Sequence, residues 1–179
     1  MIKTIAIAVA VLLVVAVAII LIVASTRPDT FRVKRTATIK APPERIFPLI
    51  DRFEAWKSWS PYEKLDPAMK REQSGPATGV GAVYAWEGNS KAGKGRMEIL
   101  ESAPSSKIVI KLDFLKPFEA HNTAEFILVP AGDSTTVTWA MYGPQIFIGK
   151  VMGLFFDMDN MIGKDFAAGL SNLKAIAER

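Results

Sequence analysis

The stretch DMDNMIGKDFAAGLSNLKAIAE, residues 157–178, decides the fold of this chain. Its apolar residues recur at intervals of three and four, which predicts one long helix with a broad apolar stripe. The opposite face carries water-compatible residues, namely Asp159, Lys164, Asp165, Asn172 and Glu178. A helix with one apolar face must cover another apolar surface, and the rest of the chain has to supply it.

The sequence predicts that this surface is a β-sheet. Between Phe31 and Tyr142 we count about seven runs with alternating apolar and polar residues, the clearest being Lys107 to Phe114. Most of them follow one another directly, which favours antiparallel hairpins. Two short helices are expected after the first strand, one opened by Pro42-Pro43-Glu44 and one over Phe53 to Trp59. The periodicity fits both a filled core and a sheet that grips the helix and leaves a cavity.

The N-terminal part of the chain has the pattern of a membrane span. An unbroken apolar run extends from Ile5 to Ala24, between Lys3 and Arg27. As a helix with a rise of about 1.5 Å per residue, it would be about 30 Å long, which matches the hydrocarbon core of a bilayer. A cleaved secretory signal is one alternative, because Val23-Ala24-Ser25 resembles a cleavage site, and a buried core helix is the other. We therefore expect a membrane anchor and linker over residues 1–30 and a folded domain over residues 31–179.

Charges near the apolar run bear on the side of the membrane that the folded domain occupies. Arg27, Arg32, Lys34 and Arg35 follow the run, whereas Lys3 precedes it. The positive-inside rule then favours a single-pass protein with a cytoplasmic domain. Three of these residues also belong to the first predicted strand, so the preference for the cytoplasmic side is weak.

Composition excludes several classes of function. The chain has 179 residues, 22 Lys and Arg against 18 Asp and Glu, one histidine and no cysteine. No basic run or aromatic–basic repeat points to nucleic acid. Disulfides and thiolate nucleophiles are impossible, and one histidine without cysteines does not make the usual zinc site. We expect no cofactor and no metal, and the sequence identifies no protein partner.

Several motifs resemble the START/Bet v 1-like (SRPBCC) superfamily, in particular its polyketide cyclase/dehydrase and lipid-transport branch. The matching stretches, which span the whole predicted domain, are Ala41–Phe47, Trp56–Pro61, Gly79–Asn89, Pro117–Asn122, Val137–Trp139 and Gly169–Lys174. The resemblance implies an α+β helix-grip fold, with a seven-stranded antiparallel sheet curled round the long helix and a hydrophobic cavity beneath that helix. None of these stretches is a catalytic motif, so the resemblance implies no catalytic residue.

Large apolar and aromatic residues on the predicted inner surfaces are our candidates for contact with a ligand. They are Trp59, Tyr84, Trp86, Met97, Ile110, Leu112, Phe126, Trp139, Met141 and Phe166. The tryptophans and Tyr84 suit core packing as well as a cavity wall, because each combines a large apolar body with one polar atom. Both interpretations remain open at this stage.

The segment Ile146–Phe156 is the second candidate for a functional role. It is apolar almost throughout, with Lys150 as its only charge. One interpretation is a buried connection to the long helix. The other is an exposed segment that either closes the cavity as a lid or touches the membrane as a patch, with Phe147, Phe155 and Phe156 as the contact residues.

The single histidine, His121, is the only side chain whose ordinary pKa lies near neutrality. Alternation places it with Glu119, Thr123 and Glu125 on the polar outer face, which favours a structural or surface role over a general base. We therefore favour a non-enzymatic, membrane-anchored module that binds a small hydrophobic or lipid-like ligand. A cyclase- or dehydratase-like enzyme and a non-catalytic scaffold for a membrane partner are the alternatives.

Overall fold

The computed structural model of the protein describes residues 2–179, and it divides into two compact units. The sheet unit consists of Arg32–Gly143 and Asp159–Arg179, and the N-terminal unit consists of the residues up to Phe31 together with Pro144–Met158. The domain boundary after residue 30 stays a prediction. The division into compact units differs from it in one respect, because Pro144–Met158 belongs to the same unit as the N-terminal residues. Each unit is described separately below.

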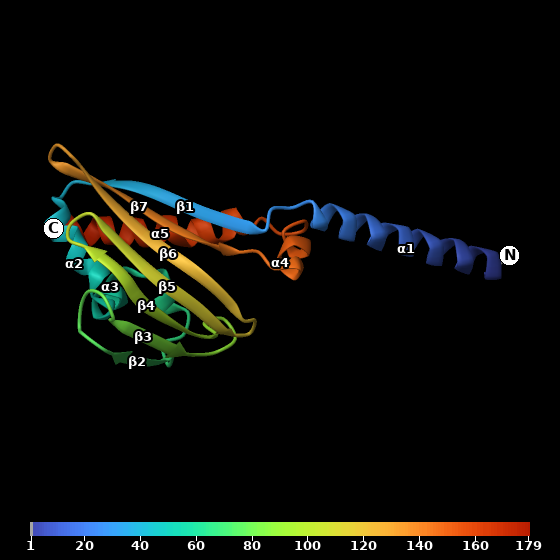
Figure 1. Ribbon diagram of the computed structural model, residues 1–179, viewed down its shortest axis with the longest axis horizontal. Coiled ribbons are helices and arrows are strands. Elements are labelled where there is room, and N and C mark those ends of the chain that lie inside the picture. The colour runs from blue at the N-terminus through green and yellow to red at the C-terminus, as the bar shows by residue number, and fades with distance from the viewer. Residues whose placement is uncertain (1) are drawn as a thin grey trace. The chain divides into compact units, whose positions relative to one another are not determined.

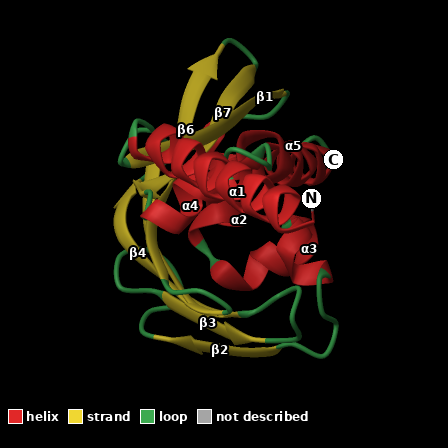
Figure 2. Cartoon of the chain, turned by 90° about the vertical axis from the view of Figure 1, so that its right-hand side faces the viewer, coloured by secondary structure: helices red, strands yellow, loops and turns green. Residues whose placement is uncertain are grey.

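Seven antiparallel strands form one open sheet in the order β1-β7-β6-β5-β4-β3-β2, which confirms the predicted fold class. The strands are β1 (Thr30–Ile39), β2 (Lys70–Ser74), β3 (Val83–Glu87), β4 (Lys94–Ala103), β5 (Lys107–Lys116), β6 (Ala120–Ala131) and β7 (Ser134–Pro144). From β2 to β7 each strand pairs with the next one along the chain, and β1 closes the order beside β7. Figures 1 and 2 show the resulting sheet as a curved surface.

The helices of the sheet unit lie within the curve of the sheet (Figure 2). They are α2 (Pro43–Asp51), the 3-10 helix η1 (Phe53–Ala55), α3 (Trp56–Trp59), the 3-10 helix η2 (Pro61–Lys64) and α5 (Met158–Ala177). Proline at the first position and Glu44 in the first turn suit the start of α2, as the sequence predicts. The two predicted short helices and the long C-terminal helix are thus confirmed.

Helix α5 buries a stripe of residues that recur every three or four positions. Its buried residues are Gly163, Phe166, Gly169, Leu170, Leu173 and Ala177. The predicted stripe also began with Met158 and Met161, but both of these side chains are exposed in the structure. The stripe is therefore buried only from Gly163 onward, and the first turn of α5 presents apolar side chains to its surroundings.

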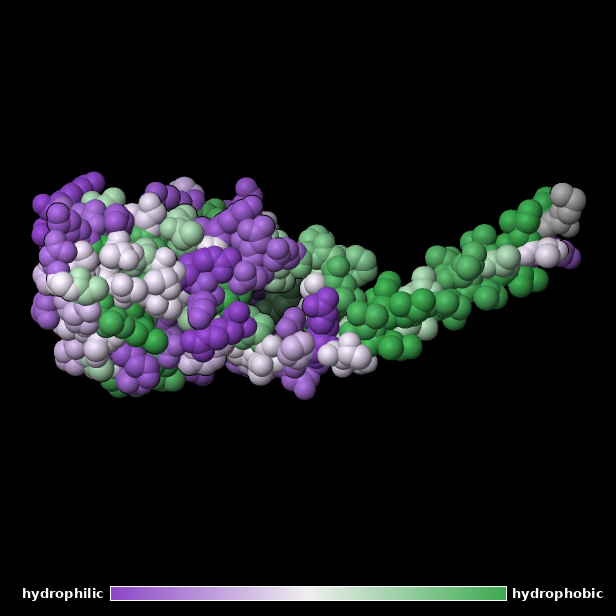
Figure 3. All heavy atoms as spheres, turned by 90° about the horizontal axis from the view of Figure 1, so that it is seen from above, coloured by the Kyte–Doolittle hydropathy of each residue, from purple (hydrophilic) through white to green (hydrophobic). Residues whose placement is uncertain are grey.

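The N-terminal unit contains α1 (Ile2–Ser25) and the short helix α4 (Phe147–Met152). Helix α1 is long and apolar enough to cross a membrane, and a signal sequence would pass the same test. Figure 3 shows hydrophobic residues along most of its length. Helix α4 was not expected from the sequence, because Gly149 and Gly153 interrupt the apolar segment with residues that weaken helices.

Candidate ligand-binding face of the sheet

The register of the sheet brings the candidate residues of five strands onto one face. Tyr84 on β3 lies opposite Met97 on β4, which in turn lies opposite Leu112 on β5. Phe126 on β6 lies opposite Trp139 on β7. Because side chains alternate along a strand, these residues share the face that packs against the helices, and we call it the inner face.

Aromatic rings fill the inner face around Trp139. The Trp139 ring stacks on Phe166 of α5 and on Phe126, and it meets Trp59 edge-on at a centroid distance of 5.6 Å. Gly169 allows this close approach, because a Cβ there would lie 2.7 Å from Cζ3 of Trp139. Three elements, namely the sheet, α3 and α5, thus meet at one indole ring.

Most of the predicted ligand-contact residues are buried in this arrangement. Those that are buried are Trp59, Tyr84, Met97, Ile110, Leu112, Phe126, Trp139, Met141 and Phe166. Trp86 is the one that stays partly exposed. The structure brings all ten into the sheet–helix interior or to its margin, and their contact with a ligand stays a prediction.

Trp86 marks the place where the inner face becomes accessible. Its ring lies over Gly95 on β4, where a Cβ would be only 2.4 Å away, and it meets Phe114 edge-on at 5.9 Å. Its indole N–H donates to the carbonyl oxygen of Ala92 at 3.0 Å. Phe114 is also partly exposed. Trp86 and Phe114 therefore form an aromatic margin beside the buried residues of the inner face.

A polar cluster interrupts the apolar inner face next to this margin. The hydroxyl of Tyr84 donates to Oε1 of Glu63, and Nε of Arg71 donates to Oε2 of the same carboxylate at 2.6 Å. Arg71 also donates to the backbone carbonyls of Glu63 and Met69. Burial, followed by the hydrogen bond to Glu63, raises the pKa of Tyr84. The phenol therefore stays protonated throughout the neutral range, and its one hydrogen is the donor in the bond to Glu63.

Two polar side chains on the inner face carry a buried atom without a hydrogen-bond partner in residues 2–179. They are the indole Nε1 of Trp139, a donor, and the amide Oδ1 of Asn122, an acceptor. Asn122 lies opposite Leu112 in the sheet, on the same face as Ala124 and Phe126. Buried polar atoms without partners are rare and destabilising, so each marks a position where a ligand atom would be favourable.

Tyr62 on η2 is a further aromatic residue at this face that the sequence analysis did not single out. Its ring meets Trp139 edge-on at 6.2 Å, and it is partly exposed. Burial and the nearby charge of Asp165 raise the pKa of its hydroxyl. Glu63, Arg71 and Asn122 were missed as well. Phe114 could have been found, because it shares the parity of Ile110 and Leu112 on β5, whereas η2 has no periodicity that would reveal its orientation.

His121 lies on the outer face of the sheet, as the alternation predicts. Its Nδ1 is 2.7 Å from Oδ1 of Asp113, which is directly opposite in the β5–β6 register, and Lys111 binds the other carboxylate oxygen at 2.9 Å. The hydrogen bond to Asp113 raises the pKa of His121. Burial opposes the charged form of Asp113, but the bonds from His121 and Lys111 outweigh it and lower that pKa. This cluster forms a surface ion-pair network away from the inner face.

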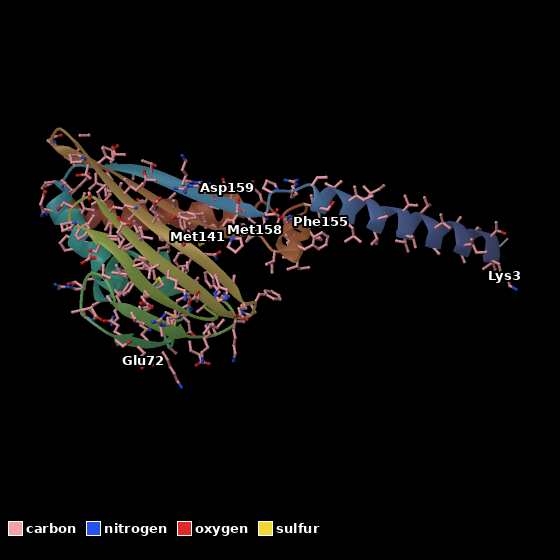
Figure 4. The ribbon with its side chains drawn as sticks, in the orientation of Figure 1. Lys3, Glu72, Met141, Phe155, Met158 and Asp159 are labelled. Atoms are coloured by element: carbon pink, nitrogen blue, oxygen red, sulfur yellow. The ribbon has the colours of Figure 1, made fainter. Side chains whose placement is uncertain are left out.

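The aromatic residues of the second candidate segment belong to the N-terminal unit. Phe147 lies in α4, and Phe155 and Phe156 follow it (Figure 4 labels Phe155). All three side chains are exposed, so the interpretation as a buried connection does not hold for them.

A curved antiparallel sheet around a long C-terminal helix, with an apolar and aromatic inner face, defines the class of helix-grip proteins. The chain belongs to the family described as polyketide cyclase / dehydrase and lipid transport, which matches residues 30–178. The resemblance seen in the sequence motifs is thereby confirmed for the family and the fold. No curated protein matches the chain.

Three solved structures with the same fold share 15–18% sequence identity with this chain. Protein CV1439 from Chromobacterium violaceum shares 18% identity over 86% of this chain and 99% of its own, with a TM-score of 0.58. Protein MLL2253 from Mesorhizobium loti shares 15% identity over 83% and 98%, with a TM-score of 0.61. The di-domain ARO/CYC protein BexL from the BE-7585A biosynthetic pathway shares 15% identity over 88% and 53%, with a TM-score of 0.61. At these identities the similarity concerns the fold alone.

Proposed function

We propose that this protein is a membrane-anchored module that holds a small hydrophobic or lipid-like ligand between the inner face of its sheet and α5. The observation that carries the proposal is the pair of buried, unpartnered polar atoms, Trp139 Nε1 and Asn122 Oδ1, on a face that is otherwise apolar and aromatic. The family's description, which includes lipid transport, agrees with this proposal.

The energetics favour a ligand with a long apolar part and one or two polar atoms. Burial of apolar surface contributes about 25 cal/mol per Å², before the costs of binding are subtracted. A buried polar atom without a partner costs about 1–3 kcal/mol, which a hydroxyl or carbonyl of the ligand would recover. We therefore expect a fatty acid or fatty alcohol to bind more tightly than an alkane of equal length.

Methyl NMR of the full chain in detergent micelles tests ligand binding. The protein contains 7 methionines, and each ε-methyl can be labelled with ¹³C and assigned by a Met→Leu variant. Met97 and Met141 lie on the inner face, whereas buried Met69 precedes β2 and serves as the control (Figure 4 labels Met141). Addition of a long-chain fatty acid should shift the signals of Met97 and Met141 in a saturable manner. Unmoved signals at saturating fatty acid would refute the ligand site.

The anchoring part of the proposal rests on α1. Except for Ile20 and Ala24, its described side chains are exposed, although nearly all of them are apolar. Exposed apolar surface of this extent is stable only in lipid. Full-length protein should remain in the membrane fraction after a carbonate wash, at its full mass. Recovery of a shortened, soluble form would instead identify a cleaved signal.

An enzyme of the cyclase or dehydratase kind is the second candidate, and the Tyr84–Glu63–Arg71 cluster is the observation that favours it. The single hydrogen of the Tyr84 hydroxyl is donated to Glu63, so a polyketide carbonyl would receive a hydrogen bond or a proton from Tyr84 by replacing the Glu63 carboxylate as its acceptor. Tyr84→Phe removes that donor but keeps the ring. Loss of turnover of a model polyketide with a retained melting temperature would support the enzyme, and retained fatty-acid binding without any turnover would support the binding module.

A further inference from the structure

The N-terminal unit carries a cluster of exposed apolar side chains outside α1. The six residues of this α4 patch are between 44% and 64% exposed, and they are Ile146, Phe147, Ile148, Met152, Phe155 and Phe156. Six large apolar side chains within eleven consecutive residues are too many for an ordinary water-exposed connection. Such a surface marks a contact with a partner or a membrane.

Helix α4 is attached to the C-terminal end of α1. The two helices are in contact, and among the described residues of α1 only Ile20 and Ala24 are not classed as exposed, with Ala24 fully buried. They are four positions apart and so lie on one side of the helix, one turn above the other. This side of the last turns of α1 is therefore the part of the helix that another element covers.

Polar contacts fix the same segment to the residues that follow α1. The backbone N–H of Gln145 donates to the carbonyl oxygen of Asp29 at 2.7 Å, and the ammonium group of Lys150 binds the Asp29 carboxylate. Lys150 is itself buried, and it is the only charged residue from Pro144 to Phe156. The α4 patch thus presents no unpaired charge.

The position of α4 along α1 matches the depth of a membrane interface. Ile20 lies roughly 8 Å from the end of α1, at about 1.5 Å per residue. Helices that lie in a membrane surface bury their apolar faces about 5–10 Å into the boundary between headgroups and acyl chains. If α1 spans the bilayer, the elements that cover Ile20 and Ala24 lie at this boundary.

We propose that the α4 patch inserts into the lipid interface next to the point where α1 leaves the membrane. The inference rests on the proposed anchoring role of α1 and adds a second, interfacial membrane contact to it. Lys150 and Asp29 neutralise each other beside the patch, so that insertion does not bury an unpaired charge. The protein would then hold the membrane through a span and a short helix that lies in the surface.

Site-specific fluorescence quenching tests this arrangement, because the chain has no cysteine and each introduced cysteine is unique. Full-length protein is reconstituted into phosphatidylcholine vesicles with an environment-sensitive fluorophore at Phe155→Cys in the patch, Leu12→Cys in the middle of α1, or Glu72→Cys on β2. All three positions are exposed, and Figure 4 labels Phe155 and Glu72. Ile148→Cys is a second patch site in case Phe155→Cys fails to fold.

The proposal predicts three distinct quenching patterns. The Phe155 label should be quenched by a lipid with a nitroxide near its headgroup, the Leu12 label by a lipid with a nitroxide deep in its chain, and the Glu72 label by aqueous iodide. Iodide quenching should be several-fold weaker at Phe155 than at Glu72.

Other patterns overturn the inference and identify the reason. If iodide quenches the Phe155 label as strongly as the Glu72 label while the Leu12 label lies in lipid, the anchor stands and the patch is in water. If neither iodide nor lipid reaches the Phe155 label, protein covers the patch, as a lid or a partner would. If the Leu12 label is not in lipid, the anchoring proposal fails and the interfacial contact fails with it.

Discussion

The indole ring of Trp139 on β7 and the phenyl ring of Phe166 on α5 lie face to face, with their centroids 4.1 Å apart and their planes 8° from parallel. Both side chains are almost completely buried. Each ring therefore determines the space that is open to the other, and together they set the distance between sheet and helix. Changes at this contact should act on the stability of the sheet unit and on any ligand that lies beside it.

Two glycines of α5 provide a matched test of this contact. Gly169→Ala places a methyl group 2.7 Å from the rigid Trp139 ring, whereas Gly163→Ala places one against the guanidinium group of Arg35, the end of a flexible side chain. Overpacking against a rigid core costs about 1–3 kcal/mol, which exceeds the gain of about 1 kcal/mol from replacing glycine in a helix. Thermal melts should show a clear loss of stability for Gly169→Ala and a smaller change for Gly163→Ala. Equal effects would contradict the tight contact at Trp139.

Phenylalanines in the two units should respond differently to truncation. Phe166 is 2% exposed, whereas Phe155 is 64% and Phe156 is 52% exposed. Phe166→Ala should destabilise the protein by about 3–5 kcal/mol, because it leaves a cavity in the core. Phe155→Ser combined with Phe156→Ser should change the melting temperature only slightly, because surface substitutions usually stay within about 0.5 kcal/mol each. A collapsed melting curve for the double variant would show that these rings are part of a core.

The ion pair of His121 and Asp113 should make stability depend on pH. The pKa of His121 is raised above its ordinary value of 6.5, so the stabilisation from its charged form is present below about pH 6.5 and disappears as the pH rises through the raised pKa. His121→Gln should therefore lower the melting temperature at about pH 5.5 and have little effect at about pH 8.5.

A second variant of the same cluster serves as the control for this pH dependence. Lys111 binds the same Asp113 carboxylate through an ammonium group, and lysine side chains ordinarily titrate far above this pH range. Lys111→Gln should therefore have a similar effect at both pH values. Fatty-acid binding should survive His121→Gln, because the side chain lies on the outer face. A pH-independent effect of His121→Gln would rule out the charged pair.

Loss of Asp29 should destabilise the contact between Lys150 and Asp29 more than loss of Lys150 does. The Lys150 side chain is 9% exposed and that of Asp29 is 94% exposed. Asp29→Asn leaves a buried ammonium group without its carboxylate, whereas Lys150→Met leaves an aspartate that water can solvate. Hydrogen exchange at the amide of Val151 in α4 and at that of Gly153, which caps the helix, should therefore accelerate more in Asp29→Asn than in Lys150→Met. The reverse order would show that the ion pair does not hold α4 in place.

The features that the sequence predicted are those set by local periodicity. Ile108, Ile110 and Leu112 occupy every second position of β5, and in the structure they lie in the core of the sheet unit. In α5, the apolar residues that recur every three or four positions from Phe166 onward are likewise buried, as their spacing predicts. Such patterns succeed because one face of each element is buried along most of its length. The inner-face candidates followed from the same rule combined with the family resemblance.

The features that the sequence missed depend on contacts between distant segments. Glu63 meets Tyr84 and Arg71 only after η2 folds over β2 and β3, and no local pattern reports that contact. Helix α4 forms although it contains Gly149, and it lies against α1 across more than a hundred residues of sequence. Met158 and Met161 continue the apolar pattern of α5 but are exposed. Periodicity predicts which residues share one face of a helix, but it does not predict whether another element covers that face.

The strand order has a consequence for how this protein behaves at high density. An open sheet leaves two edges with free backbone groups, which readily pair with other chains. At the β1 edge, α5 supplies partners, since Lys174 Nζ donates to the Thr38 carbonyl and Glu178 accepts the Lys40 N–H. At the other edge, β2 is only 5 residues long, with the sequence KREQS. If α1 anchors the chain as proposed, molecules on one membrane surface collide often in similar orientations, and both edges discourage such encounters from becoming intermolecular sheets.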